Sequence, residues 1–195
     1  MARQATVERK TKETQIKLTL NLDGSGENTI STGIGFFDHM LTLFSRHSLI
    51  DLTIAASGDL EVDYHHTVED IGICLGKALA EALGDKKGIT RFGNASLPMD
   101  EVLANVAIDL SGRPYLVFNA EFTDQKVGDY DTALTVEFFQ AVATHAGANL
   151  HVNVAYGDNA HHINEAIFKA FALALSAGAS PRAGVKGIPS TKGSL

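Results

Sequence analysis

The chain has 195 residues, of which 45% are hydrophobic and 20% are charged, and its formal net charge is −7. This length and apolar content suffice for a folded core, and the negative charge argues against a nucleic-acid or polybasic membrane-surface binder. No run approaches the ~20 apolar residues of a membrane helix, and the polar start lacks the apolar core of a signal peptide. The single cysteine, Cys74, lies in an apolar stretch. It predicts a buried thiol without a disulfide and favours the reducing cytoplasm.

Alternating apolar residues and helical periodicity predict the same order of elements in each half of the chain. In the first half, the strand TQIKLTLNL is followed by a helix over residues 34–48, by the strand LIDLTIAA and by a helix that starts at residue 65. The second half gives VLANVAIDL, PYLVFNAEF, residues 131–147, NLHVNVAY and the stretch from residue 161, with one further strand that has no clear signal. We therefore predict an α+β fold in which a β-β-β-α-β-α half-domain occurs twice, with mostly antiparallel sheets packed against helices.

An internal duplication is the clearest feature of the sequence. DYHHTVED (residues 63–70) and NAHHINEA (residues 159–166) each place two histidines before a glutamate, at an offset of 96 positions from His65 to His161. Upstream, an offset of 98 aligns His47 with His145 and His39 with Glu137, which predicts a short insertion or deletion between the two segments. The expected units are residues 1–88, residues 89–180 and a Gly-, Pro- and Ser-rich tail at residues 181–195, with the joint near residues 84–94.

The HHxxE pattern predicts metal ligands. On a helix the first histidine and the glutamate share a face, whereas adjacent histidines diverge by about 100°. One pair therefore does not easily chelate a single ion, and it suggests two metals or one metal and one substrate contact. Imidazole and carboxylate donors without thiolate indicate Mn²⁺, Fe²⁺, Zn²⁺ or Co²⁺. We expect Asp63 and Asp70 to orient the imidazoles, and Asp63 and Asn159 to cap the helices.

Each candidate also has an ordinary interpretation. A single HH pair near a helix start is usually a polar surface feature, and the duplication in register is what favours metal binding. His39, on an apolar helix, reads as a satisfied core or surface histidine, and His151 as a structural strand residue. His47 and His145 lie near helix ends, where a cation suits the helix dipole. By themselves Arg91 and Arg113 are turn residues, Lys192 is a solvated end charge, and Glu13 is a surface acid.

Four motifs in this order, GFFDHML, DYHHTVED, NAHHINEAIFKAF and PSTKGSL, make the chain resemble the imidazoleglycerol-phosphate dehydratase family over residues 3–195. The resemblance implies dehydration of D-erythro-imidazole-glycerol phosphate to imidazole-acetol phosphate in L-histidine biosynthesis. It also implies a duplicated fold of the ribosomal protein S5 domain 2-like kind, a cytoplasmic 24-subunit shell with active sites between subunits, and two Mn²⁺ ions per site. No phosphatase domain is fused to the motifs, so a monofunctional enzyme is expected.

The resemblance assigns roles position by position. It implies these metal ligands: His39, His65, His66, Glu69, His161, His162 and Glu165. At the eighth position the chain departs from the family, because Glu137 stands where many members have histidine; we expect Glu137 to bind metal as a carboxylate. The substrate-binding candidates are His47, Arg91, Arg113, Lys169, Ser190, Thr191 and Lys192. Glu13 and, after it, Asp100 are the acid–base candidates.

The implied mechanism uses two metal ions on the nitrogens of the substrate ring, which hold it as an imidazolate-like anion while a proton and hydroxide leave. Two rival classes share the HHxxE pairs. A two-metal hydrolase would act through a metal-bound hydroxide, and a non-catalytic metal-binding shell protein would not need the Arg/Lys set or the PSTKGSL tail.

Overall fold

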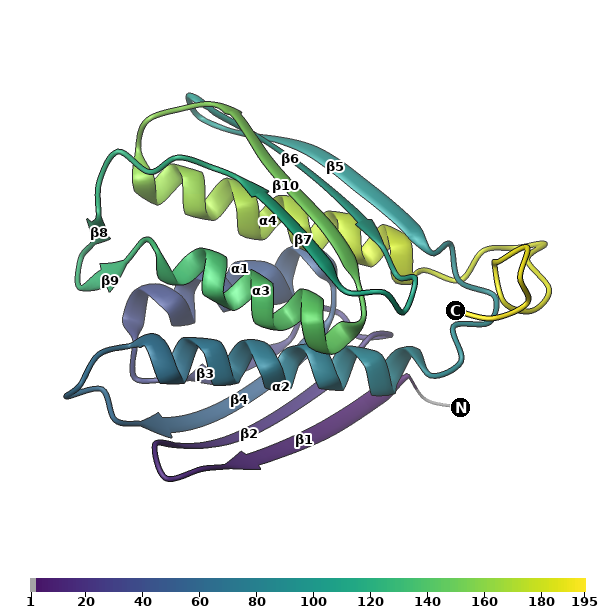
Figure 1. Cartoon of the computed structure of the whole chain (residues 1–195), viewed down its shortest axis with the longest axis horizontal. Coiled ribbons are helices and arrows are strands. Elements are labelled where there is room, and N and C mark those ends of the chain that lie inside the picture. Colours follow the sequence, from purple (N-terminus) through teal and green to yellow (C-terminus); the bar gives the residue numbers. More distant parts are fainter. Residues whose placement is uncertain (1–2) are drawn as a thin grey trace.

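The computed structural model describes residues 3–195, so residues 1–2 of the predicted first half lie outside the described part. Within this part, four helices lie between two four-stranded sheets (Figure 1). The first half contains β1 (Gln4–Lys10), β2 (Thr14–Asn21), β3 (Asn28–Ser31), α1 (Gly35–Ser48), β4 (Asp51–Gly58) and α2 (His65–Leu83). The second contains β5 (Phe92–Met99), β6 (Val102–Asp109), β7 (Tyr115–Asn119), α3 (Leu134–Ala146), β10 (Asn149–Tyr156) and α4 (Ala160–Ala179). A small hairpin, β8 (Lys126–Val127) and β9 (Tyr130–Asp131), precedes α3.

The two sheets have the same topology, which confirms the predicted duplication. Their strand orders are β1-β2-β4-β3 and β5-β6-β10-β7. Each sheet is antiparallel except for one parallel pair, β3 with β4 and β7 with β10. β4 starts at Asp51 and β10 at Asn149, which reproduces the offset of 98. The change to an offset of 96 falls in the loop before α2 and α4, as the sequence alignment predicts.

β5 is the strand that the sequence pattern does not reveal. It runs FGNASLPM, in which the half-buried positions alternate with exposed ones but begin with the small residues Gly93 and Ala95. The reason is its close approach to α4: a Cβ at Gly93 would lie 1.8 Å from the carbonyl oxygen of Ala174. A strand that approaches a helix this closely carries small residues on its inner face, which weakens the apolar signal by which strands are predicted.

The helices pair across the two halves. α1 packs against α4, and α2 packs against α3. Gly72 allows close contact between α2 and α3, because a Cβ there would lie 2.8 Å from the Cβ of Ala141. Aromatic rings fill the interface, with centroids of Phe37 and Phe138 5.2 Å apart and those of Phe44 and Phe171 5.5 Å apart. Each half therefore buries its helices against the other half, in one continuous core.

Cys74 is fully buried in this core, and burial chiefly raises the pKa of its thiol to about 11. The predicted buried thiol without a disulfide is confirmed. None of the helices formed by residues 3–195 combines the length and apolar character needed to cross a membrane.

The two ends of the molecule carry different features. The loops that lead into α2 and α4 lie at one end, and the C-terminal tail lies at the other (Figure 1). The tail is tied to the joint between the halves, since the backbone of Gly88 donates to Gly187 at 2.9 Å and accepts from Arg182 at 2.8 Å. The HH pairs and the tail are therefore separated by the length of the helices within one chain.

Candidate active site

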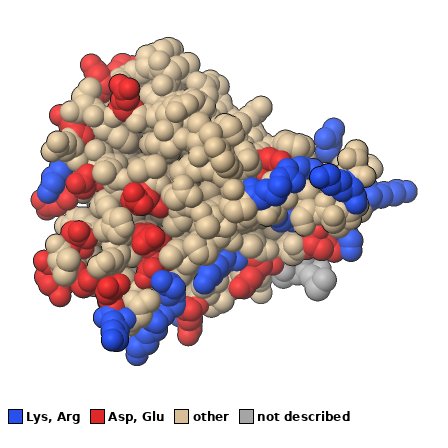
Figure 2. All heavy atoms as spheres, viewed as in Figure 1, with Lys and Arg blue, Asp and Glu red and all other residues tan. Residues whose placement is uncertain are grey.

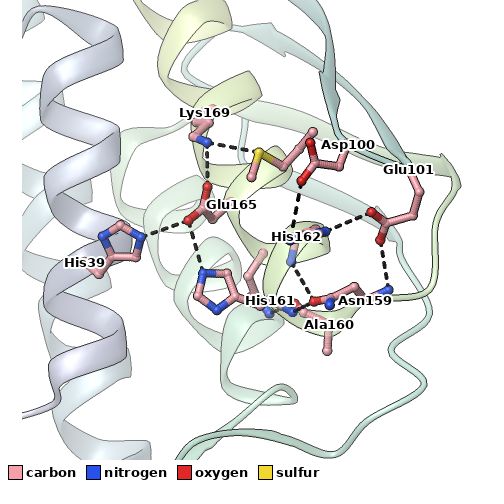
Figure 3. A network of polar contacts seen from close by, with 11 residues as sticks. His39, Asp100, Glu101, Asn159, Ala160, His161, His162, Glu165 and Lys169 are labelled. Carbon is pink, nitrogen blue, oxygen red and sulfur yellow. Dashed lines mark hydrogen bonds and ion pairs between the residues drawn. The ribbon is translucent and has the colours of Figure 1, made fainter.

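The start of α4 sets the directions of its two histidines. Asn159 is the N-cap, and its side chain accepts hydrogen bonds from the backbone N–H groups of His161 at 2.9 Å and His162 at 3.2 Å, which confirms the predicted cap. The two imidazole rings diverge, with centroids 6.2 Å apart and planes at 78°. Figure 3 shows His161 turned toward Glu165 and His162 turned toward Glu101. Each histidine therefore serves a different partner.

Three predicted ligands converge at the interface of α1 and α4. Oε1 of Glu165 lies 2.9 Å from Nε2 of His39 and 3.1 Å from Nε2 of His161 (Figure 3). One donor atom of each residue lies within 4.8 Å of the others. Ligands at right angles around an ion with bonds of about 2.1 Å are about 3 Å apart, so this spacing fits one divalent cation. Two imidazoles and a carboxylate are donors suited to manganese, iron or zinc.

Glu165 is held ionised at this site. Burial by itself would raise the pKa of its carboxyl group, but hydrogen bonds from Lys169, His39 and His161 outweigh burial and lower this pKa to about 2. The contact with Nζ of Lys169 is 2.5 Å long. A carboxylate that stays charged throughout the neutral range is ready to bind a cation.

His162 is flanked by two acids from the turn between β5 and β6. Its Nδ1 lies 2.8 Å from Oε2 of Glu101, and its Nε2 lies 3.7 Å from Oδ2 of Asp100. The hydrogen bond to Glu101 is the main cause that raises the pKa of His162. Asp100 is a predicted acid–base candidate. Glu101 is not predicted, and its position directly after Asp100 is the one sequence feature that indicates it.

His66, the second histidine of the first pair, is flanked in the same way. Its Nδ1 lies 3.0 Å from Oδ2 of Asp59, and its Nε2 lies 4.0 Å from Oε1 of Glu13. The hydrogen bond to Asp59 is the main cause that raises the pKa of His66. The structure thus brings the candidate acid Glu13 to the histidine pair, and it adds Asp59, which no sequence motif predicts.

The prediction that Asp63 and Asp70 orient the imidazoles is wrong. Oδ1 of Asp63 accepts from the backbone N–H of His65 at 2.7 Å, so Asp63 bonds the first backbone donor of α2 from the position before the N-cap, Tyr64. Asp70 is buried and accepts from Oγ1 of Thr14 at 2.5 Å, while its other oxygen lies 2.9 Å from Nε of Arg9. Asp70 points away from the histidine rings because it lies on the face of α2 that packs on the sheet.

The remaining first-half ligands do not converge within one chain. Nε2 of His65 lies 3.9 Å from Oε2 of Glu69. Glu137 comes from α3, the helix that packs on α2, and lines a hollow of about 530 Å³ together with His65. In the part of the chain that the structure describes, only the His39, His161 and Glu165 donors form a compact group.

Most candidates for phosphate binding lie together at the tail end. Arg91, Arg113, Ser190, Thr191 and Lys192 line one hollow of about 650 Å³. Figure 2 shows a group of Lys and Arg side chains at this end of the molecule. The cations and hydroxyls of such a group suit a phosphate.

Arg91 is the best-fixed member of this group. Its Nε and Nη2 donate to the two oxygens of Asp109 at 2.7 and 3.0 Å, and its Nη1 donates to the carbonyl of Pro189 at 2.9 Å. Its backbone has a φ of 74°, in the left-handed region, and its N–H donates to Gly178 at 2.8 Å. Arg91 therefore links the end of β6, the end of α4 and the tail.

Lys169 and His47 lie apart from this group. Lys169 contacts Glu165 and, at 3.3 Å, Sδ of Met99. Burial chiefly, and then the charge of Lys169, lowers the pKa of His47, which disfavours the cation that its place near a helix end suggests. The substrate-binding candidates thus occupy two places, one beside the His39, His161 and Glu165 cluster and one at the tail.

Comparison with known proteins identifies the family. Residues 32–175 match the family model described as imidazoleglycerol-phosphate dehydratase. The chain belongs to the imidazoleglycerol-phosphate dehydratase family. It is 59% identical to imidazoleglycerol-phosphate dehydratase of Geobacter sulfurreducens and 61% identical to that of Citrifermentans bemidjiense, with 100% of each chain covered.

Solved structures of the family share the fold. The imidazoleglycerol-phosphate dehydratase of Staphylococcus aureus is 44% identical, with a TM-score of 0.84, and the match covers 92% of this chain and 99% of that one. The enzyme of Pyrococcus furiosus is 39% identical, with a TM-score of 0.85, and the match covers 97% of this chain and 100% of that one. The resemblance inferred from the four sequence motifs is confirmed.

Proposed function

We propose that this chain dehydrates D-erythro-imidazole-glycerol phosphate to imidazole-acetol phosphate for L-histidine biosynthesis, using two Mn²⁺ ions in each active site of a cytoplasmic 24-subunit enzyme. The dehydratase activity follows from family membership over the full length of the chain. The metal ions, the 24-subunit assembly and the cytoplasmic location are proposals. The observation that carries the metal proposal is the convergence of His39, His161 and Glu165 on one point.

The histidines and carboxylates divide into two ligand groups. His39, His161 and Glu165 would hold one ion within the chain. The other group would be completed by a neighbouring subunit: His65, His66, Glu69, Glu137 and His162. When bound, the two cations supply positive charge and Lewis acidity beside the substrate ring, where negative charge develops.

Glu13 and Asp100 are the residues that we propose to move protons. They lie beside Nε2 of His66 and of His162, at 4.0 and 3.7 Å. Both carboxylates are exposed at the end of the chain that bears the HH pairs. A carboxylate in this position can take a proton from a substrate carbon or return one to a leaving hydroxyl group.

The separation of the two ends supports active sites shared between subunits. His161 and Gly178 lie at opposite ends of α4, about 25 Å apart at 1.5 Å per residue. Arg91 and the tail lie at the Gly178 end. Imidazole-glycerol phosphate joins its ring and phosphate through three carbons, which span less than about 10 Å with bonds of ~1.5 Å. One molecule therefore cannot reach the metal ligands and the tail of the same chain.

The most direct test is metal-dependent turnover. Purified protein is stripped of metal with a chelator and assayed for imidazole-acetol phosphate before and after addition of Mn²⁺. We expect activity to disappear and then to return, because the ions supply the charge that the reaction needs. Full activity of the metal-free protein would contradict the metal proposal and leave the dehydratase assignment intact.

Mixing two inactive variants tests the shared site. His161→Ala removes a metal ligand, and deletion of residues 190–195 removes the tail. Equal amounts are denatured together and reassembled, so that about one quarter of shared sites receive an intact metal end and an intact tail. We expect activity to return to roughly that fraction. Mixed assemblies that stay inactive would place the tail and the metals of one site in the same chain.

The tail deletion also separates the proposal from its rivals. Without residues 190–195 the chain should keep its fold and bound metal but lose dehydration, since Ser190, Thr191 and Lys192 contact the phosphate. Deletion of residues 193–195 alone is the matched control and should leave most activity. A metal-binding shell protein would tolerate both deletions, and a two-metal hydrolase would cleave a test ester with or without the tail.

A further inference from the structure

The second histidine of each pair has a carboxylate at each of its ring nitrogens. We propose that Asp59 and Glu101 are positioning residues that fix the rings of His66 and His162 with Nε2 as the free donor nitrogen. This inference rests on the proposed metal sites. It concerns two residues that the ligand set does not include, and both bond Nδ1, at 3.0 and 2.8 Å.

The chemistry of imidazole explains what such a contact does. A neutral imidazole carries one proton, and the hydrogen bond made by one nitrogen decides which nitrogen keeps its lone pair. A carboxylate at Nδ1 holds the proton there, and Nε2 is left to bind a cation. In both halves Nε2 faces the side that holds the acid–base candidates, Glu13 or Asp100. The same contact therefore orients the donor and keeps it close to the proposed proton-transfer group.

The surroundings of Asp59 point to this role. Its side chain is only 19% exposed, and Oδ1 is buried without a hydrogen-bond partner among residues 3–195. The His66 ring is thus the polar contact of a largely buried acid. The backbone N–H of Asp59 also donates to the carbonyl of Glu13 at 3.1 Å. Asp59 therefore fixes the ring relative to the turn that carries Glu13.

Glu101 connects the same two parts in the second half. Its Oε2 accepts from His162, and its Oε1 accepts from the backbone N–H of Asn159 at 3.2 Å. Asn159 is the N-cap of α4, so Glu101 holds the ring relative to the start of the helix. Asp100, on the same turn, is held close to Nε2 as a result.

The two halves reach this arrangement by different routes. Glu13 and Glu101 occupy matching positions, each directly before the second strand of its half, β2 or β6. Yet Glu13 lies beside Nε2, whereas Glu101 bonds Nδ1, and in the first half Asp59 from the end of β4 takes the Nδ1 place. The two halves therefore place a carboxylate at Nδ1 from different positions of the repeat. This indicates that the site requires the contact, because inheritance from a common ancestor would have kept the same position.

Substitution of each acid by its amide tests the proposal. Asp59→Asn and Glu101→Gln keep size and remove charge, and each should weaken Mn²⁺ binding to metal-free protein by about 10- to 100-fold, measured by calorimetry. Asp63→Asn is the control for Asp59, because Asp63 also lies beside His66 but bonds only backbone at the start of α2. Asp158→Asn is the control for Glu101, as an exposed acid next to Asn159. Both controls should change Mn²⁺ affinity by less than about threefold.

A spectroscopic measurement separates positioning from general destabilisation. In ¹⁵N-histidine spectra of the metal-free protein, the Nδ1–H forms of His66 and His162 should dominate, and each amide variant should shift its own ring alone. Unchanged Mn²⁺ affinity in either amide variant, or equal weakening by its control, would overturn the proposal for that residue. If one variant fails to fold, the other still tests the idea in its own half. Wild-type protein that binds no Mn²⁺ would instead contradict the proposed function.

Discussion

The two HHxxE helices begin with the same motif and yet build different environments. At the start of α4, Glu165 is 10% exposed and lies in contact with His39, His161 and Lys169. At the start of α2, Glu69 is 46% exposed and lies 3.9 Å from His65. The difference comes from the helix packed alongside. His39 on α1 reaches α4, whereas its repeat partner Glu137 lines a hollow near α2 without closing it. The motif therefore supplies donors, and the neighbouring helix decides whether they meet.

The largest expected effect distinguishes the closed cluster, formed by His39, His161 and Glu165, from the open cluster, formed by His65, Glu69 and Glu137. His161→Ala should lower kcat/KM by at least about 10²- to 10³-fold, because it removes positive charge from the site of reaction. His65→Ala should also lower activity and weaken the assembly, through the second ion that we propose a neighbouring subunit helps to bind. The sharpest measurement is Mn²⁺ bound by dilute, dissociated subunits, with sedimentation to establish their size. Wild type and His65→Ala should bind one ion each and His161→Ala none; full metal occupancy in both variants would defeat the ligand assignment.

Variants of Glu137 test whether this residue completes the open cluster as a metal ligand. Glu137→Gln keeps the shape of the side chain and removes its charge, so one of the two ions in the assembled enzyme should bind about 10- to 100-fold more weakly. Glu137→His replaces the carboxylate with an imidazole, which is also a suitable metal donor, and should retain both proposed ions. Calorimetric titration with Mn²⁺ resolves the two sites. Two tight ions in the Gln variant would remove Glu137 from the ligand set.

Asp109 tests the tail end, which differs from both clusters in having cations and no histidine. Asp109→Asn weakens the two charge-assisted hydrogen bonds that hold Arg91, and Arg91 in turn holds the tail at Pro189. We expect KM to rise about tenfold with bound metal unchanged, which corresponds to about 1.4 kcal/mol, within the range for one hydrogen bond to a charged group. Faster tryptic cleavage after Lys186 or Lys192 reports the loosened tail. Asp129→Asn, an exposed acid near β9, is the control and should change neither quantity.

The smallest effect concerns the acid stability of the metal-free closed cluster. The folded state lowers the pKa of Glu165 to about 2 from an ordinary value of 4.5. The ionised carboxylate therefore stabilises the fold above about pH 4.5, and this contribution is lost as the pH falls from 4.5 through 2. Glu165→Gln should flatten the fall in unfolding free energy over this range, measured by urea denaturation. Equal slopes in wild type and variant would mean that the contacts of Glu165 do not stabilise the folded metal-free chain.

The duplicated fold and the candidate histidine and carboxylate donors can be predicted from the sequence, because both depend on local sequence patterns. The HH pairs, the Asn159 cap and the repeat offsets are short-range features, and each has its structural counterpart. Other features depend on tertiary packing. His39 and Glu165 are 126 positions apart, so their contact required knowing that α1 packs on α4. No sequence motif predicts that Asp59 contacts His66. The strand β5 is hard to predict because its contact with α4 requires small residues.

The packing of each helix against a helix of the other half bears on how such a protein could arise. α1 is buried by α4 and α2 by α3, so either half in isolation would expose an apolar helical face and would lack a donor for its own HHxxE motif. A half-length ancestor with this pattern would have had to dimerise in order to bury these helical faces. Gene fusion would then have freed the two copies to diverge, so that Glu165 came to contact two histidines while Glu69 stayed half exposed.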